Sequence, residues 1–211
     1  MATSIRAVSM FGPEARSRAR KQLEGGFSLL EVMISMVILM VGLVSLLGVF
    51  GLAMATTLTS KEDMIAKQLA NEAYESILTA RNSSQLTWDD VQNSGSTNCP
   101  VSGSATCGIF LVPAQPMYKA GLDGIYGTSD DANAGQQILE EPGSDGVYGS
   151  TDDVLTPLTG YKRTIQFSQV LDANNNVIPT VRAVNITVQY WTSQSRVQKT
   201  YTLNSFISQF N

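Results

Sequence analysis

The stretch that decides the fold is residues 26–57, GFSLLEVMISMVILMVGLVSLLGVFGLAMATT. After Glu31 the chain carries no charged residue until Lys61, and this run exceeds the roughly 20 apolar residues that a helix needs to cross a bilayer. Basic residues precede the run, and by the positive-inside rule they keep that end in the cytoplasm. The stretch therefore predicts one membrane-spanning helix, with everything after Ser60 exported.

Glu31 is the one charged side chain within this stretch. A carboxylate near the bilayer centre costs about 2.5 to 3.5 kcal/mol on insertion scales, so it needs a partner. An ordinary secretory signal, with Ala53-Met54-Ala55 as its cleavage pattern, has a shorter apolar core of roughly 7 to 15 residues. An uncleaved anchor helix accounts for the apolar run but leaves Gly25-Gly26 and Glu31 unexplained.

A third interpretation uses the order of the features, which is a basic leader, Gly26, Phe27, Ser-Leu-Leu and then Glu31. This order resembles the class III signal of type IV prepilins and pseudopilins. The resemblance implies that residues 1–26 are a leader, that prepilin peptidase cuts between Gly26 and Phe27, and that Phe27 is then N-methylated. It also implies that residues 27–57 stay attached as a transmembrane and assembly helix. The chain would lie in the inner membrane first and then in a cell-surface or periplasmic filament with other pilins.

Cleavage after Gly26 would also give Glu31 a partner. It creates an amine on Phe27, one helical turn away, and the resemblance implies that the amine of a neighbouring subunit pairs with Glu31. A buried ion pair only roughly offsets its desolvation, so its expected contribution is the axial register between subunits rather than net stability.

Charge and composition exclude several function classes. The first 26 residues carry a net charge of +3 and the remainder −7, and an acidic body does not suit phosphate neutralisation, so we expect no nucleic-acid partner. The chain has no histidine, the commonest general base, and adjacent acids such as Asp130 and Asp131 do not make an acid–base pair with a nucleophile. We therefore expect no enzyme activity.

Cys99 and Cys107 are the only cysteines. The segment between them is rich in Ser, Gly and Pro and can bend back, so a disulfide is expected in an oxidising compartment. Two free thiols are the alternative if this region stays in the cytosol.

The exported part predicts an α+β fold. Residues 58–81 continue the helix as an amphipathic segment, because Ile65, Leu69, Ala73 and Ile77 recur at helical spacing. Residues 82–160 are rich in turn formers and predict a loop region with the cysteine pair and an acidic repeat.

Residues 161–211 predict an antiparallel β-meander that packs on the helix. Its three segments, YKRTIQFSQVL, TVRAVNITVQYW and RVQKTYTLNSFI, alternate apolar and polar residues and are separated by turn compositions. In the second segment, one face carries Val184, Ile186, Val188 and Tyr190 and is expected to cover the helix. The ITVQYW and YTLNSFI sequences resemble PilV-type minor pilins.

GLDGIYGTSDD at residues 121–131 recurs as GSDGVYGSTDD at residues 143–153. Residues 120–161 hold eight acidic residues and no basic ones, which repel each other unless a cation neutralises them. Ca²⁺ is the predicted ion, because it accepts six to eight oxygen ligands in flexible geometry. The candidate ligands are Asp123, Asp130 and Asp131 in the first copy and Asp145, Asp152 and Asp153 in the second. A pair of solvated Asp-Gly turns is the alternative.

Tyr126 and Tyr148 occupy equivalent positions in the two copies. They either pack against the rest of the exported part or face a partner, and we expect packing. Together, these resemblances imply a minor pilin-like structural subunit of a type IV pilus. The alternatives are a type II secretion pseudopilin and a calcium-dependent surface adhesin.

Overall fold

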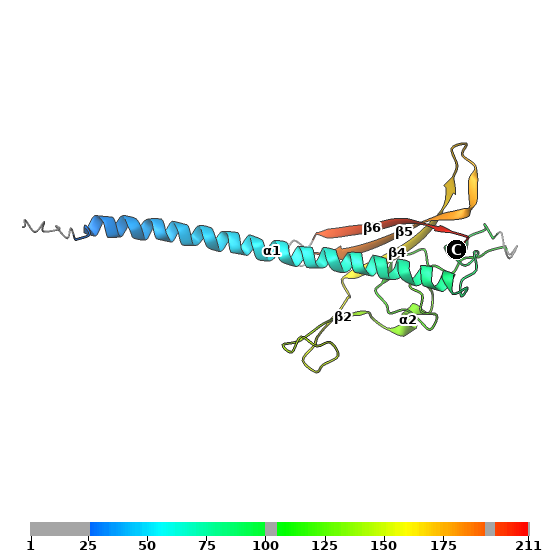
Figure 1. Cartoon of the computed structure of the whole chain (residues 1–211), viewed down its shortest axis with the longest axis horizontal. Helices are drawn as coiled ribbons and strands as arrows, with labels where there is room; N and C mark the ends of the chain where they lie inside the picture. Colours follow the sequence, from blue (N-terminus) through cyan, green and yellow to red (C-terminus); the bar gives the residue numbers. More distant parts are fainter. Residues whose placement is uncertain (1–25, 100–104, 193–196, 211) are drawn as a thin grey trace, which may run out of the picture. The chain divides into compact units, whose positions relative to one another are not determined.

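The computed structural model describes residues 26–99, 105–192 and 197–210 (Figure 1). The chain divides into two compact units, Met1–Val49 and Phe50–Asn211. One helix, α1 (Leu29–Asn82), belongs to both units. We call the part of the second unit from Lys61 onwards the head.

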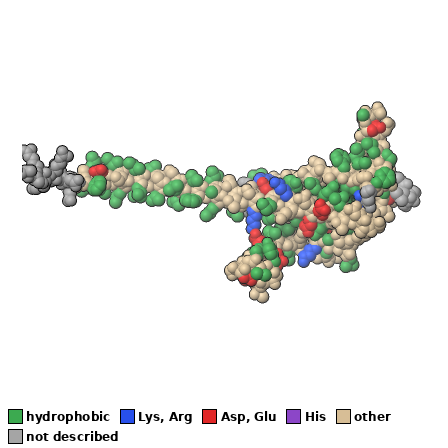
Figure 2. Space-filling view, in the orientation of Figure 1, with side chains coloured by type: hydrophobic (Ala, Val, Ile, Leu, Met, Phe, Trp, Pro, Cys, Tyr) green, Lys and Arg blue, Asp and Glu red, His purple; other side chains and the backbone are tan. Residues whose placement is uncertain are grey.

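In the first unit every described residue is exposed, and α1 there carries one apolar side chain after another (Figure 2). In the head the same helix changes character and buries one stripe. The buried residues of that stripe are Ile65, Ala66, Leu69, Ala70, Ala73, Ile77 and Ala80. Four of the seven are alanines, whose small side chains let the helix axis come close to the strands that it covers.

The head contains a four-stranded antiparallel sheet in the order β1-β4-β5-β6, in which the edge strand β1 spans Gln115–Pro116. Its long strands are β4 (Tyr161–Leu171), β5 (Val177–Trp191) and β6 (Gln198–Ser208). These are the three predicted strands, so the α+β fold with an antiparallel meander is confirmed. β5 begins at Val177, within the segment expected to be a turn, because its ladder with β4 resumes beyond a register shift between Gln169 and Val170.

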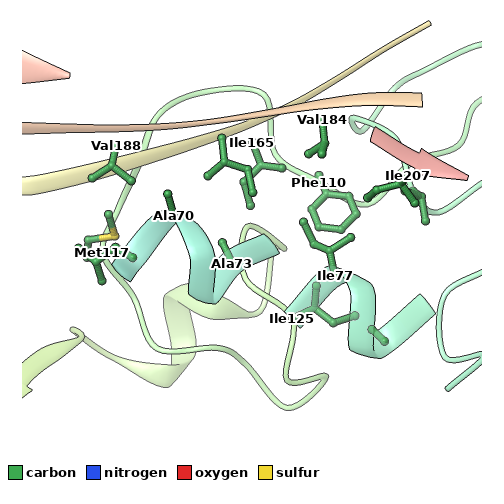
Figure 3. Close-up of a cluster of buried hydrophobic side chains, with 14 of the residues drawn as sticks. Ala70, Ala73, Ile77, Phe110, Met117, Ile125, Ile165, Val184, Val188 and Ile207 are labelled. Carbon is green, nitrogen blue, oxygen red and sulfur yellow. The ribbon is translucent and has the colours of Figure 1, made fainter. Parts of the chain in front are cut away.

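The core lies between α1 and the inner face of the sheet (Figure 3). Val184, Ile186, Val188 and Tyr190 are buried, as the alternation in β5 predicts, and their neighbours on the other face are partly exposed. Phe110, Met117 and Ile125 complete the core, and all three come from the segment between α1 and β4.

That segment contains more regular structure than a loop region. β1 (Gln115–Pro116) extends the sheet, α2 (Asp131–Ala134) is a single turn of helix, and β2 (Ile138–Glu141) pairs with β3 (Val154–Pro157) as a hairpin. The hairpin was not predicted, because four-residue strands carry too few alternations of apolar and polar residues to be recognised in the sequence. The second copy of the acidic repeat forms the connection of this hairpin.

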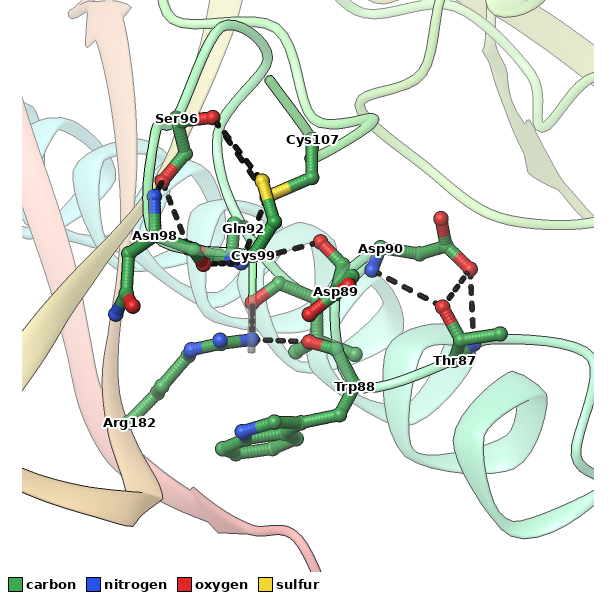
Figure 4. The surroundings of a disulfide bond; sticks show 11 residues. Thr87, Trp88, Asp89, Asp90, Gln92, Ser96, Asn98, Cys99, Cys107 and Arg182 are labelled. Carbon is green, nitrogen blue, oxygen red and sulfur yellow. Dashed lines mark hydrogen bonds between the residues drawn. A yellow bond between two sulfur atoms is a disulfide. The ribbon is translucent and has the colours of Figure 1, made fainter. Parts of the chain in front are cut away.

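Cys99 and Cys107 form a disulfide bond, as predicted for an oxidising compartment (Figure 4). The neighbouring turn is fastened to the sheet by Arg182, whose guanidinium donates to the carbonyl oxygens of Trp88 and Val91. Arg182 also lies over the Trp88 ring, 4.2 Å from its centroid, and burial lowers the pKa of Arg182 to about 10. This charged anchor was not foreseen, because it joins residues 94 positions apart in the sequence.

Candidate functional site

The predicted cleavage site lies in an open part of the chain. Gly26 and Phe27 precede the helix, and Phe27 is 82% exposed. No atom outside its immediate neighbours lies within 4 Å of the position that a Cβ on Gly26 would take. Nothing in the described residues therefore obstructs access of a protease to the Gly26–Phe27 peptide bond.

Glu31 stands in the first turn of α1, and its backbone N–H donates to the Ser28 carbonyl at 2.9 Å. A carboxylate in the first turn interacts favourably with the positive end of the helix dipole, which stabilises the start of the helix. The side chain is exposed, so it is available to a group from another molecule.

α1 is long and apolar enough to cross a membrane. The apolar window is not covered by other parts of the described chain. Two environments exclude water from such a surface, which are a lipid bilayer and a bundle of similar helices.

The second candidate site is the pair of acidic loops, residues 121–131 and 143–153. Their hydrogen bonds repeat with the sequence. The Gly121 and Gly127 N–H groups donate to Asp131 at 3.0 and 2.6 Å. At the equivalent positions, the Gly143 and Gly149 N–H groups donate to Asp153 at 3.2 and 2.6 Å.

The same correspondence holds at the first aspartate of each copy. The Ile125 N–H donates to Asp123 at 2.8 Å, and the Val147 N–H donates to Asp145 at 2.9 Å. The two copies are therefore one local structure formed twice, and the aspartates in both turns are held by backbone donors.

Two of the repeated glycines leave space for an acidic side chain. A Cβ on Gly121 would lie 2.2 Å from the Asp130 carboxylate, and one on Gly143 would lie 2.3 Å from that of Asp152. Any larger residue at these positions would displace the carboxylate. A glycine at this position of each copy therefore leaves room for the aspartate carboxylate beside it.

The structure brings together each predicted set of ligands. One carboxylate oxygen from each of Asp123, Asp130 and Asp131 lies within 4.8 Å of the others, and the same is true of Asp145, Asp152 and Asp153. Three converging carboxylates match the oxygen chemistry of Ca²⁺. The local hydrogen bonds also satisfy these aspartates in part, as the solvated-turn alternative requires.

The two sets differ in their surroundings. Asp131 is buried, and burial raises its pKa against the opposing effect of the Gly127 and Gly121 N–H groups. Asp152 is exposed, and hydrogen bonds from the Ser150 and Ser144 hydroxyls lower its pKa to about 2. The carboxylates of the first loop are therefore held partly inside the head, and those of the second loop face solvent.

The expectation that both repeat tyrosines pack is correct for Tyr126 and wrong for Tyr148. Tyr126 is partly buried against the head, whereas Tyr148 is 67% exposed. The reason is tertiary: the first loop lies beside α1 and β4, and the second connects a hairpin whose own residues do not cover it.

Comparison with known proteins identifies the N-terminal part of the chain. Residues 21–47 match the family model of the prokaryotic N-terminal methylation motif, a range that includes Gly26, Phe27 and Glu31 and ends within α1. No curated protein and no solved structure matches the chain. The chain thus carries the prepilin-type signal that the order of its first residues indicates.

Proposed function

We propose that this chain is a minor pilin-like structural subunit of a type IV pilus. The observation that carries the proposal is the methylation motif at residues 21–47, joined to a helix whose apolar surface the head leaves uncovered. Prepilin peptidase removes residues 1–26, Phe27 becomes the methylated N-terminus, and the helix anchors the subunit in the inner membrane until it enters the filament.

Assembly uses the same helix for a second purpose. Its apolar side chains leave the lipid and pack among those of other pilins, so the protein–lipid contacts are replaced by contacts between helices. Glu31 then meets the Phe27 amine of a neighbouring subunit. Because each subunit offers both charges at fixed positions, this pairing defines the axial stagger without adding much net stability.

The head serves as a structural or adhesive surface, without a catalytic role. We propose that the two aspartate sets bind Ca²⁺, one near Asp131 and one near Asp153. This is supported by the convergence of three carboxylates in each copy and by the absence of basic residues from 120–161. Bound cations would offset the mutual repulsion and fix the loops.

The decisive experiment is mass spectrometry of the mature protein from sheared filaments and from membranes of the producing cell. The proposal requires a chain that begins at a methylated Phe27 and is recovered with the filaments. Any other first residue would contradict the cleavage site. A correctly processed chain that never leaves the membrane and periplasm would instead support a type II secretion pseudopilin.

A calcium-dependent adhesin is the second candidate, and the paired acidic loops favour it. It is tested by comparing surface binding of cells that produce the full chain with and without Ca²⁺. Calcium-dependent attachment that disappears with Asp130→Asn and Asp152→Asn, while filaments remain normal, would support adhesion. Normal attachment with defective fibres would support the structural role alone.

A further inference from the structure

The two copies of the acidic repeat have the same local structure but opposite exposure. Ile125 is 1% exposed, while its equivalent Val147 is 59% exposed. The following tyrosines differ in the same way, since Tyr126 packs against the core cluster and Tyr148 is 67% exposed. The difference lies in what surrounds each loop and not in the loop itself.

The first copy shows what this loop binds when it is docked. The Arg163 guanidinium lies over the Tyr126 ring, 4.3 Å from its centroid, and the Tyr126 hydroxyl donates to Glu72 of α1. A Cβ on Gly127 would lie 2.6 Å from the Ile165 side chain, so the loop is in close contact with β4. The docking surface thus combines an arginine for the ring face, a carboxylate for the hydroxyl and aliphatic side chains.

The first loop is also fastened to α1 by polar contacts at its edges. Gln85 donates to the Asp123 carbonyl at 2.6 Å, and the Tyr126 N–H donates to the Ser76 hydroxyl at 3.4 Å. In the second loop, all the hydrogen bonds found among the described residues stay between Glu140 and Asp153. That loop keeps the docking residues Val147 and Tyr148 without a docking surface from the described chain.

The two strands of the same hairpin carry further exposed apolar residues. They are Ile138, Val154 and Leu155, and the last two are 56% and 60% exposed. Residues 138–157 also contain five acidic residues and no basic one, and of these Glu141 pairs with Lys61 of α1 at 2.5 Å. One Ca²⁺ ion together with Lys61 would still leave the hairpin negative. A surface that fits this hairpin therefore combines apolar side chains with basic ones.

We propose that Val147 and Tyr148 at the tip of the β2–β3 hairpin dock onto an arginine-bearing face of a different subunit of the same filament, a partnership that rests on the proposed function. Tyr148 stacks on that arginine as Tyr126 stacks on Arg163. A second copy of this chain is the poorer partner, because its own Ile125 and Tyr126 already fill the equivalent surface. The acidic hairpin further selects a basic face.

The test places a photo-cross-linking amino acid at position 151, an exposed residue of the same loop that leaves Tyr148 intact. The full chain is produced in its own cells, irradiated and recovered with sheared filaments, and the cross-linked peptide is identified by mass spectrometry. The expected peptide contains an arginine and belongs to another subunit with an N-terminal methylation motif. Tyr148→Ala and Val147→Asp should each lower the yield at least tenfold.

Leu171→Ser is the matched control, because Leu171 is an exposed apolar residue of another hairpin, between β4 and β5, and its replacement should change the yield less than twofold. Replacement of the identified partner arginine by Glu should reproduce the effect of Tyr148→Ala. A cross-link to another copy of this chain, or a yield that Tyr148→Ala leaves unchanged, overturns the inference. Absence of the wild-type chain from filaments overturns the proposed function itself, whereas incorporation without a cross-link overturns the docking alone.

Discussion

At the scale of single residues, Gly26 and Glu31 both belong to the matched motif, but we expect them to act at different steps. Gly26 lies in the open segment before the helix, where an added Cβ would meet no atom within 4 Å beyond its chain neighbours. Glu31 lies within the helix and offers an exposed charge on an apolar surface. Substitution at each position should therefore stop the protein at a different stage.

Gly26→Leu should block processing. A branched side chain beside the scissile bond meets open space within this chain, so it should not disturb the fold. It enlarges the segment that has to enter the peptidase, so the unprocessed chain should accumulate in the membrane. Gel mobility and the N-terminal mass measure the outcome. Gly42→Leu, a substitution of the same size within α1, is the control and should leave cleavage intact; normal maturation of Gly26→Leu would refute the assigned site.

Glu31→Ala should permit cleavage and impair assembly. The peptidase site is unchanged. In the proposed pairing the Phe27 amine of the neighbouring subunit would lose its partner, and an unpaired buried charge costs about 3–5 kcal/mol. Quantification of the mature chain in sheared filaments should show a fall of tenfold or more. Wild-type amounts in the fibre fraction would exclude a register role for this carboxylate.

At the scale of elements, α1 packs on the sheet along its alanine-rich stripe. It also makes a polar contact with the sheet at Asp63, where the head begins. There the Tyr190 hydroxyl donates to Asp63, and the Lys199 ammonium lies 3.2 Å from the same carboxylate. The Tyr190 hydrogen bond lowers the pKa of Asp63, although desolvation opposes it. This contact links α1, β5 and β6.

Asp63→Asn should lower stability at neutral pH but not in acid. Because the folded-state pKa is depressed, the contribution of Asp63 is present above its unfolded pKa of about 3.9 and is lost as pH falls through the lower folded value. The Asp63 side chain is 41% exposed, so solvent screening limits the effect to about 1 kcal/mol or less. Chemical unfolding of the full chain in detergent at pH 7 and near pH 2 measures the difference.

The control for this experiment is Glu75→Gln, an exposed acid on the same helix. It removes one negative charge without touching β5 or β6. A loss of stability in Asp63→Asn that is equal at both pH values would show that packing, and not the charge of Asp63, joins the helix to the sheet.

At the scale of the whole molecule, calcium removal should act on two regions with different consequences. The first loop is enclosed by α1 and β4, and the second lies on an exposed hairpin. Hydrogen exchange of the full chain with and without chelator should show faster exchange in residues 121–131 and 143–153. A ligand at 100 times its dissociation constant stabilises by about 2.7 kcal/mol, so the change should approach 100-fold.

Loss of calcium from the first loop should also speed hydrogen exchange in neighbouring elements, more than loss of calcium from the second loop. Asp130→Asn should loosen Phe110 and Ile125 in the core as well, whereas Asp152→Asn should remain confined to the hairpin. Exchange that is indifferent to Ca²⁺ would favour the solvated-turn alternative for both loops.

Much of the architecture could be predicted because its signals are local. The apolar run, the helical stripe from Ile65 to Ile77 and the alternation through β5 each follow from the period of one element. The hairpin β2–β3 and the buried Arg182 could not be predicted in the same way. The strands of the hairpin are too short to show an alternation of apolar and polar residues. From the sequence alone, Arg182 is expected to be an exposed charge, because its contact with Trp88 forms only in the folded head.

The sequence by itself determined the membrane helix, the three long strands and the two sets of aspartates, because each depends on residues near one another in the chain. Tertiary structure alone decided that two nearly identical loops have opposite surroundings. Tyr126 is covered because Glu72 and Arg163 arrive from distant elements, and Tyr148 is exposed because the described chain brings no such pair to it. Burial depends on the neighbours that folding supplies, and those neighbours are not encoded in the repeat.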